Sequence, residues 1–478
     1  MLPLSEVDTS DGNLADLGVE QLSALFRSGA ASPVDAAEAA LDRIDAFDPE
    51  VNAFVHVDRA TTLSMARAAE DRYRTGAMLS PIDGVPTSIK DLAPVAGWPL
   101  RRGSEALDPA VPSPEDSPPV ARLREAGAVF LGKTSTPESG SRIVTRSKVH
   151  GVTRNPYALD RTPGGSSGGA AAALALGMGT LALGTDGAGS IRIPAAFCNV
   201  AGLKPGFGRV PSYPPTMFMP HSVTGPMARR VADLILMTSV MAGPEPRDPY
   251  AWPIPFNLSA AADPSIEGSR IAVSRTLGTR ATADESTVDA LFNAADALAA
   301  RGAIIAEADP VWPVDPFGPF MVFWEATYAG FLDTYPDDIA AKMDPLLHEI
   351  AGRGRRIDIL TYHRAIAERL QIAAASRSFF TQFDAVLAPV MPSPAFDIDA
   401  EAPPGELPDD WRWCPFTYIF NMTGEPALAV PAGFEPGGLP IGLQIAGPVG
   451  SEERLLRIGA VLEAALGLVE RRSPLLEA

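Results

Sequence analysis

The run GTDGAGSIR, residues 184–192, places Ser190 on a glycine- and alanine-rich turn that directly follows an apolar segment. Residues 181–184 predict a buried strand, so the turn begins where that strand ends. A serine on such a turn acts as a nucleophile only when a base accepts its proton, and no histidine lies near Ser190 in the sequence. The base is therefore expected from a distant part of the chain.

The composition is that of a globular protein with an acidic balance. Among the 478 residues, 46% are apolar and 20% are charged, and the net charge is −19. This charge disfavours nucleic acid and anionic membrane surfaces as partners. Cys198 and Cys414 are too few for a disulfide framework or a zinc site, and the histidines lack metal-ligand spacing, so we expect no metal. Residues 1–12 lack the parts of a signal peptide and no apolar run spans a bilayer, which predicts a cytoplasmic protein.

Helical and strand patterns alternate along the chain. Apolar periodicity and capping residues predict helices over residues 33–47, 58–73, 118–126, 170–176, 227–241, 284–301 and 452–466. Strands are predicted over residues 85–89, 128–131, 181–184, 386–389, 427–430 and 441–445. Strands interleaved with helices are typical of an open α/β sheet, and the absence of internal repeats and long linkers predicts a single domain.

A second glycine and serine cluster, GGSSGG, occupies residues 164–169 and permits three interpretations. It matches the G-x-S-x-G elbow of α/β-hydrolases, with Ser166 as nucleophile and His221, His348 or His363 as base. That elbow needs a preceding strand, whereas residues 155–163 contain two prolines and no apolar alternation. A phosphate-binding loop is the second interpretation, but the Walker lysine is missing. The third is a tight turn that opens an alanine-rich helix.

Two further motifs lie in order around these clusters. Upstream, PIDGVPTSIKD, residues 81–91, predicts a strand that ends in Lys90, and downstream the chain continues into GLKP, residues 202–205. This order of a strand-end lysine, a GGSSGG serine and a G-[ST]-D-x-[GA]-G-S serine resembles the amidase signature family of Ser-Ser-Lys hydrolases. Similar flanking blocks at residues 132–134, 225–227, 231–233, 415–417 and 438–444 extend the resemblance over most of the chain.

The resemblance implies an α/β amidase signature fold, in which a large twisted mixed β-sheet is flanked on both faces by α-helices. One domain is expected over residues 1–478. Within it we expect four regions: an N-terminal helical region at 1–80, a catalytic signature core at 81–245, a substrate-side elaboration at 246–430, and a C-terminal strand and helix at 431–478.

The resemblance also implies the catalytic residues. Ser190 is similar to the family's nucleophile, Ser166 to its bridging serine after a cis peptide bond at Gly165, and Lys90 to its base. The proton of Ser190 then passes through Ser166 to a neutral Lys90. Such a path is chemically reasonable because burial lowers the pKa of a lysine, and a hydroxyl donates and accepts a proton at once. This chemistry needs no cofactor.

Backbone N–H groups on the glycine-rich turn are the implied donors to the oxyanion: Gly187, Ala188, Gly189 and Ser190. The methyl group of Ala188 is compatible with this role only if its φ is negative or mildly strained. Asp186 and Arg192 are interpreted as residues that brace the loop.

Aromatic residues leave the substrate pocket open to two interpretations. Phe320 and Trp324 belong to a stripe at helical spacing, which is typical of a core but also suits a pocket wall. Phe416 belongs to a second aromatic cluster, and Met217 and Phe218 belong to a segment that suits an adaptable lid.

Gly140 and Ser141 align loosely with family positions near the bound acyl group. We expect a hydrolase that cleaves C–N bonds of small, uncharged, apolar or aryl amides through an acyl-enzyme intermediate. Carbamates and esters are further expected substrates because they share the attack and the oxyanion. The enzyme is expected to be a monomer or homodimer. An alternative is the A subunit of a glutamine-dependent tRNA amidotransferase, although PHSVTGP at residues 220–226 replaces the S-x-D-Q-x-G-P run associated with those subunits.

Overall fold

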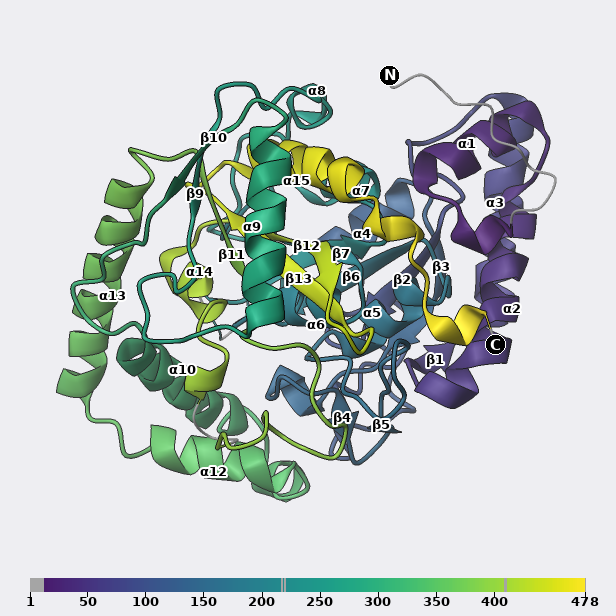
Figure 1. Ribbon diagram of the computed structural model, residues 1–478. Coiled ribbons are helices and arrows are strands. Elements are labelled where there is room, and N and C mark those ends of the chain that lie inside the picture. The colour runs from purple at the N-terminus through teal and green to yellow at the C-terminus, as the bar shows by residue number, and fades with distance from the viewer. Residues whose placement is uncertain (1–12, 216–217, 219–220, 408–410, 478) are drawn as a thin grey trace.

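The computed structural model describes residues 13–215, 218, 221–407 and 411–477. Within these ranges an 11-stranded sheet has the order β1-β3-β2-β6-β8-β7-β12-β13-β11-β9-β10, and β4 and β5 form a separate short pair (Figure 1). The strands are β1 (Phe54–Val57), β2 (Pro86–Lys90), β3 (Val129–Thr134), β4 (Arg146–Ser147), β5 (Gly151–Val152), β6 (Leu181–Asp186), β7 (Ala201–Lys204), β8 (Val223–Ala228), β9 (Arg270–Val273), β10 (Ile304–Glu307), β11 (Ala385–Pro389), β12 (Ala427–Phe434) and β13 (Pro440–Ala446).

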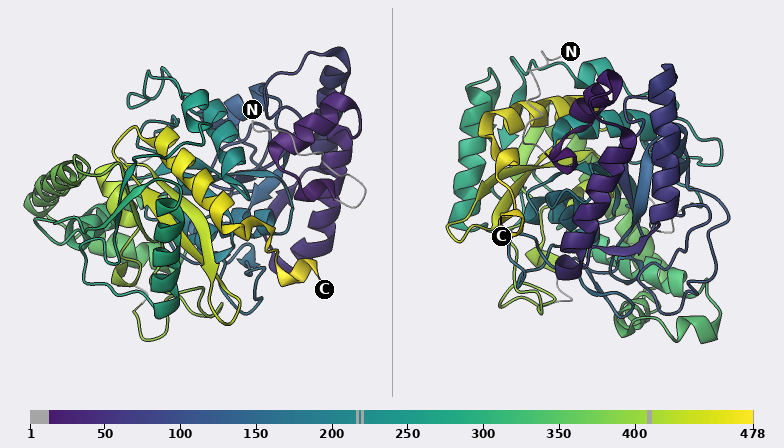
Figure 2. Two further views of the ribbon diagram at one scale, coloured as in Figure 1. Left: turned by 45° about the horizontal axis from the view of Figure 1, so that its top comes forward. Right: turned by 90° about the vertical axis from the view of Figure 1, so that its right-hand side faces the viewer.

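Helices cover both faces of the sheet, and α1, α2 and α3 stand beside its β1 edge (Figures 1 and 2). The helices are α1 (Val19–Ser28), α2 (Pro33–Val51), α3 (Arg59–Thr75), α4 (Pro118–Glu125), α5 (Gly168–Ala175), α6 (Arg192–Phe197), α7 (Val231–Met241), α8 (Leu258–Ala261), α9 (Glu285–Ala299), α10 (Phe317–Leu332), α11 (Asp337–Ala340), α12 (Pro345–Gly354), α13 (Ile359–Phe379), α14 (Tyr418–Thr423) and α15 (Glu452–Leu466). This arrangement confirms the expected α/β fold with a mixed sheet between helical layers.

The direction of the strands brings two predicted site segments together. β3, β2 and β6 run parallel, and Ile89 of β2 pairs with Leu183 of β6. Because parallel strands end at the same side of a sheet, Lys90 at the end of β2 and Asp186 at the end of β6 lie close together. From β6 to β11 neighbouring strands are antiparallel, and β11, β9 and β10 form a second parallel block.

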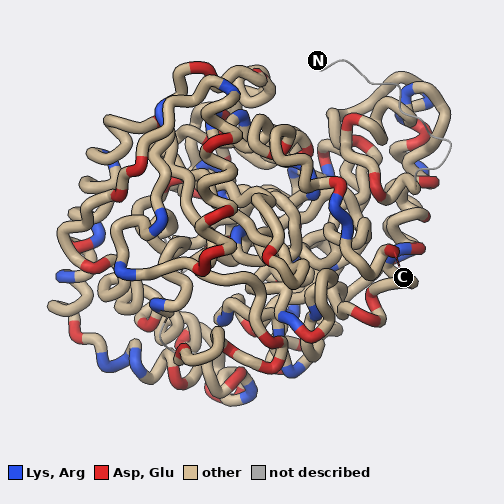
Figure 3. Tube along the Cα trace, in the orientation of Figure 1, with Lys and Arg blue, Asp and Glu red and all other residues tan. Residues whose placement is uncertain are grey.

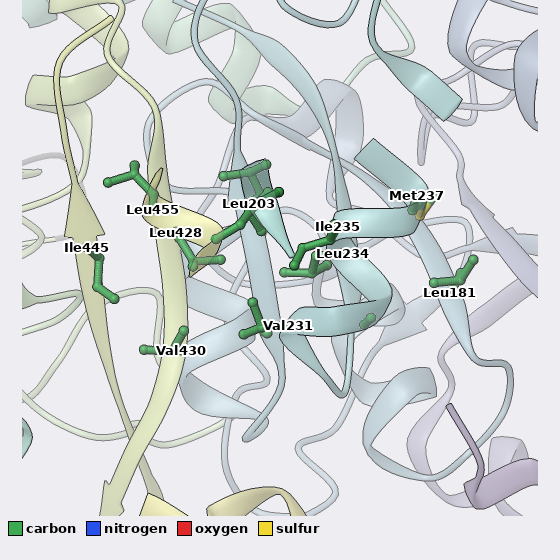
Figure 4. Packing of buried hydrophobic residues seen from close by; sticks show 14 of the residues in the cluster. Leu181, Leu203, Val231, Leu234, Ile235, Met237, Leu428, Val430, Ile445 and Leu455 are labelled. Atoms are coloured by element: carbon green, nitrogen blue, oxygen red, sulfur yellow. The ribbon is translucent and has the colours of Figure 1, made fainter. Parts of the chain in front are cut away.

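One face of the sheet packs against α4, α7, α9 and α15. Figure 4 shows Leu203, Leu428 and Val430 of the strands beside Val231 and Leu234 of α7 and Leu455 of α15. All these side chains are buried. Leu428 and Val430 lie two residues apart on β12, so the two-residue period of a strand directs both side chains to this face.

The opposite face packs against α5 and α6, and α10, α12 and α13 continue that layer outward (Figure 1). Ala182 and Ala429 lie on this face, each one residue away from a leucine of the other face. Ala188, on the turn after β6, and Trp324 of α10 belong to the same cluster of buried residues. The predicted nucleophile loop is therefore enclosed between the sheet and the outer helices.

Most predicted elements occur with ends shifted by a few residues, but the predicted helix over residues 227–241 is wrong at its start. Val223–Ala228 is strand β8, and α7 begins at Val231. Met227 pairs with Ala182 on one side and with Gly202 on the other, so backbone pairing overrides the local helical pattern. Strands from each of the four predicted regions join the large sheet.

No helix within the described ranges combines the length and the apolar character that crossing a bilayer requires.

The contact between α15 and β12 predicts how the core responds to added volume. A methyl group at Gly459 would lie 2.3 Å from Cδ2 of the fully buried Leu428. We expect Gly459→Ala to lower the free energy of unfolding by about 1–3 kcal/mol, because a packed core resists extra atoms. Gly352 of α12 has open space around its Cα, so Gly352→Ala is the matched control and should gain about 0.5–1 kcal/mol. Urea titration measures both, and equal stability of the two variants would contradict the packing at Gly459.

Candidate active site

Lys90 ends β2, and the hydrogen bonds of its amine go to hydroxyl groups. Nζ lies within hydrogen-bond distance of three hydroxyl oxygens: Ser166 Oγ at 2.8 Å, Ser167 Oγ at 2.8 Å and Thr185 Oγ1 at 2.9 Å. The side chain is fully buried. Among the described residues, no carboxylate forms an ion pair with this amine.

Burial determines the protonation of Lys90. Desolvation lowers the pKa of Lys90 well below its ordinary value, and the negative charge of Asp186 offsets this only in part. A neutral amine carries a lone pair that accepts a proton, whereas an ammonium group only donates. The amine can therefore take a proton from the hydroxyl groups around it.

The GGSSGG cluster forms the turn that opens α5, and Ser166 and Ser167 immediately precede its first residue, Gly168. A methyl group at Gly168 would lie 2.2 Å from Thr145 Oγ1, and one at Gly165 would lie 2.8 Å from a backbone carbon of the neighbouring loop. Close packing therefore requires glycine on both sides of the serine pair. The peptide bond between Gly165 and Ser166 is cis, as the resemblance implied.

A buried ion pair holds the turn that carries Ser190. Asp186 accepts hydrogen bonds from the backbone N–H of Gly189 at 2.7 Å and of Ile191 at 3.1 Å, and its carboxylate lies 3.0 Å from the Arg192 guanidinium. Burial alone would raise the pKa of Asp186, but Arg192 holds that pKa below its ordinary value and keeps the carboxylate ionised. The expected bracing of the loop by Asp186 and Arg192 is present.

These contacts revise the expected set of oxyanion donors. The Gly189 N–H already donates to Asp186, so the candidates that remain are the N–H groups of Gly187, Ala188 and Ser190. Gly189 has a φ of +121°, and a methyl group there would lie 2.6 Å from Thr417 Oγ1, so glycine serves the shape of the turn. Ala188 is not among the described non-glycine residues with positive φ, and its methyl group fits without strain.

Ser166 and Ser190 line one cavity of about 320 Å³. Lys90 does not line it, so Ser166 stands between the amine and the cavity. The backbone joins the two serine loops, because the Ser167 N–H donates to the Ser190 carbonyl oxygen at 3.1 Å. The outer walls come from residues 92–94, 211–215 and 222–224 and from the C-terminal part of α10.

Three of the expected substrate-binding residues reach the cavity: Gly140, Phe218 and Trp324. A methyl group at Gly140 would lie 3.3 Å from Ser166 Oγ, so this glycine leaves room directly beside that hydroxyl. Met217 lies outside the described residues.

The structure corrects the expectation for three other residues. Phe320 is 1% exposed and stacks on Tyr418 with ring centroids 4.6 Å apart, and Phe416 is fully buried in another cluster. Neither ring lines the cavity, because each is enclosed by other buried side chains. Ser141 lines a separate pocket of about 100 Å³, of which Trp324 also forms a wall.

Sequence reasoning missed several wall residues, among which Arg102 matters most. It is the one charged residue among the described residues that line the cavity, and its Nη1 donates to the Tyr335 hydroxyl at 3.4 Å. No charged residue was among the expected substrate-binding residues, and Arg102 adds a charge to the cavity wall. No local signal could have found Arg102, because an arginine in a loop is usually solvated.

The histidine base of the α/β-hydrolase interpretation is not beside Ser166. His221 is buried against Phe323, and neither of its ring nitrogens has a hydrogen-bond partner among the described residues. His348 Nε2 contacts the Ala340 carbonyl oxygen, and His363 is exposed on α13. Within the described part of the chain, no three His, Cys, Asp or Glu side chains gather in a way that suits a metal ion.

Comparison with known proteins identifies the family. The Amidase family model matches residues 35–456. The chain belongs to the amidase signature family. An acylamidase of Rhodococcus erythropolis is 36% identical over 95% of this amidase and 96% of that protein. The A subunit of a glutamyl-tRNA(Gln) amidotransferase from Rhodopirellula baltica is 35% identical, with coverage of 94% and 96%.

Solved structures agree with this assignment. The crystal structure of a bacterial aryl acylamidase of the amidase signature family has a TM-score of 0.88 and 28% identity to this amidase, and the match covers 96% of this chain and 98% of that one. Together with the acylamidase relative, the match shows that this chain is an amide-hydrolysing enzyme.

The ion pair below the Ser190 turn predicts a large effect of removing one charge. Asp186→Asn leaves the Arg192 guanidinium buried without a counter-charge, so we expect a loss of about 3–5 kcal/mol of unfolding free energy. Urea titration measures it, with Asp338→Asn on the exposed side of α11 as the matched control, which should change stability by less than about 0.5 kcal/mol. If Asp186→Asn is as stable as wild type, the side-chain oxygens of Gln444 and Asn421, which also accept from Arg192, are enough to hold it.

Proposed function

We propose that this amidase hydrolyses small amides whose groups beside the scissile bond are uncharged and apolar or aryl, through an acyl-enzyme intermediate on Ser190. One observation carries the proposal: a fully buried lysine whose amine is hydrogen-bonded to hydroxyls, with one of these hydroxyls between it and the cavity. A charged structural lysine would be expected to have a carboxylate beside it. An amine surrounded by hydroxyls is suited to accept a proton.

The proposed reaction begins when Ser190 Oγ attacks the carbonyl carbon of the amide. Its proton moves to Ser166 Oγ while the proton of Ser166 moves to Lys90 Nζ, which lies 2.8 Å away. The backbone N–H groups of Gly187, Ala188 and Ser190 are the candidates that stabilise the oxyanion. Lys90 then returns its proton through Ser166 to the leaving amine, and the C–N bond breaks. Water attacks the acyl-enzyme by the same proton path and releases the acid.

The cavity wall supports the class of substrate. Phe218, Trp324, Tyr328 and Phe331 give it aromatic surface, and the prolines of residues 211–215 add apolar contacts. The names of two relatives, an acylamidase and an aryl acylamidase, fit a substrate of this kind. Carbamates and esters belong to the proposal because they form the same acyl-enzyme linkage and oxyanion. Glutamine is the contrasting substrate, which is expected for the A subunit of an amidotransferase but not for this amidase.

Covalent labelling tests the roles of the three residues. A fluorophosphonate should add once to the wild-type protein, with the adduct on the peptide that contains Ser190, as intact mass and peptide mapping would show. Ser190→Ala should give no adduct. Ser166→Ala and Lys90→Met should react at least about 100-fold more slowly, because the proton path is interrupted. Circular dichroism confirms that each variant is folded. An adduct on Ser166 that survives Ser190→Ala would overturn the proposal.

The lowered pKa of Lys90 predicts the pH dependence of the reaction. Only the neutral amine accepts a proton, so kcat/KM for an uncharged anilide should rise as the pH increases through the pKa of Lys90, which burial places well below 10.5. Activity is lost as the pH falls below that pKa. A pH–rate profile measures this limb. Lys90→Arg keeps a charge but supplies no base, and should lose about 10²–10⁴ of kcat/KM at every pH. A profile that rises only near pH 10.5 would contradict the lowered pKa of Lys90, and a profile that keeps the same rise in Lys90→Arg would exclude Lys90 as the base.

A further inference from the structure

Arg102 occupies a fixed position on the cavity wall. Its carbonyl oxygen accepts a hydrogen bond from the Ser139 N–H at 2.8 Å, next to Gly140, which adjoins Ser166 Oγ. The residue adopts a φ of +50°, and a methyl group on the following Gly103 would lie 2.7 Å from the Thr136 carbonyl oxygen. The backbone of Arg102 is therefore packed against the same loop that borders the bridging serine.

Most N–H donors of the Arg102 guanidinium form no hydrogen bond to a described side chain. It carries five N–H donors, and among the described residues its one hydrogen bond to a side chain is the 3.4 Å contact with Tyr335. Other cationic groups near the site have carboxylate partners: Lys133 lies 3.2 Å from Asp91, and Arg142 pairs with Asp344 at 2.7 Å. Within the described part of the chain, no carboxylate pairs with Arg102.

The other residues of the cavity wall carry no charge that could pair with Arg102. Among the described residues that line the cavity, every side chain except Arg102 is uncharged, and none is an acid. The chain as a whole carries a net charge of −19, with Asp and Glu distributed over its trace (Figure 3). A half-buried arginine that lies beside aromatic surface, and that no described carboxylate neutralises, is suited to receive a planar anion through paired N–H donors.

The geometry points to Arg102 as a specificity residue that binds a carboxylate of the substrate, at a distance from the scissile amide. Arg102 and Ser190 line the same cavity of about 320 Å³, which suits a small molecule held at both places. This inference rests on the proposed function, since it assigns the substrate of that same site. The substrate class is thus an aryl or apolar amide that carries a carboxylate on its far end.

Two pairs of near-isosteric ligands test the inference. N-phenylsuccinamate and butyranilide differ by a carboxylate on the acyl side, and 4-acetamidobenzoate and 4-methylacetanilide differ by one on the amine side. Calorimetry on Ser190→Ala measures binding without turnover. We expect the acid of at least one pair to bind about tenfold or more tightly than its neutral partner, as a charge-assisted contact allows. Arg102→Gln in the same background should bring that ratio close to one, and Arg102→Lys should retain part of it.

Arg101→Gln is the matched control, because Arg101 adjoins Arg102 but does not line the cavity, and the ratio should remain as in the parent. If Arg102 only braces the wall through Tyr335, Arg102→Gln weakens both members of a pair equally and leaves their ratio unchanged, which overturns the inference. Equal binding of acid and neutral partner in both pairs also overturns it. The proposed function is judged separately, by whether wild type hydrolyses the anilides and Ser190→Ala does not.

Discussion

The proposed chemistry of this amidase depends on a lysine that is buried among hydroxyls rather than beside a carboxylate. β2 lies between β3 and β6, and the buried side chain of Lys90 at its end contacts the serine turn that opens α5. Lys133 of the adjacent strand is equally buried but has Asp91 beside it, and it remains part of an ion pair. Lys90 has three hydroxyls instead. The same residue type in neighbouring strands is thus structural in one place and suited to proton transfer in the other, because one partner differs.

The Asp186 carboxylate pairs with Arg192 rather than with Lys90. Its oxygens form an ion pair with the Arg192 guanidinium and accept hydrogen bonds from the backbone N–H groups of Gly189 and Ile191. These contacts satisfy its charge and also fix the shape of the turn that carries Ser190. A carboxylate free to approach Lys90 would favour the ammonium form and raise the pKa of the amine. One ion pair therefore fixes the shape of the turn that carries Ser190 and occupies the carboxylate that lies nearest in sequence to it, which suits the proposed role of Lys90 as a neutral base.

The cavity combines two kinds of structure. Its inner end comes from strand ends and glycine-rich turns of the sheet, where close backbone packing leaves little freedom of position. Its outer walls come from α10 and from loops that carry aromatic, proline and hydroxyl side chains, together with Arg102. The matched aryl acylamidase shares the fold over nearly the whole chain at 28% identity. A scaffold of this kind allows the walls to change while the strand ends that carry the proposed catalytic residues keep their arrangement.

Short motifs in the sequence were sufficient to predict the family and to single out Lys90, Ser166 and Ser190. The periodicity within single elements was sufficient to predict the α/β fold. The helix expected at residues 227–241 failed at its start, since Met227 is paired with strands on both sides and no local pattern records that pairing. The tertiary structure alone decided that Phe320 and Phe416 face the core, that Asp186 takes the Gly189 N–H, and that Arg102 reaches the cavity. Each of these depends on which distant segment packs against a residue, and the sequence contains the segments but not their contacts.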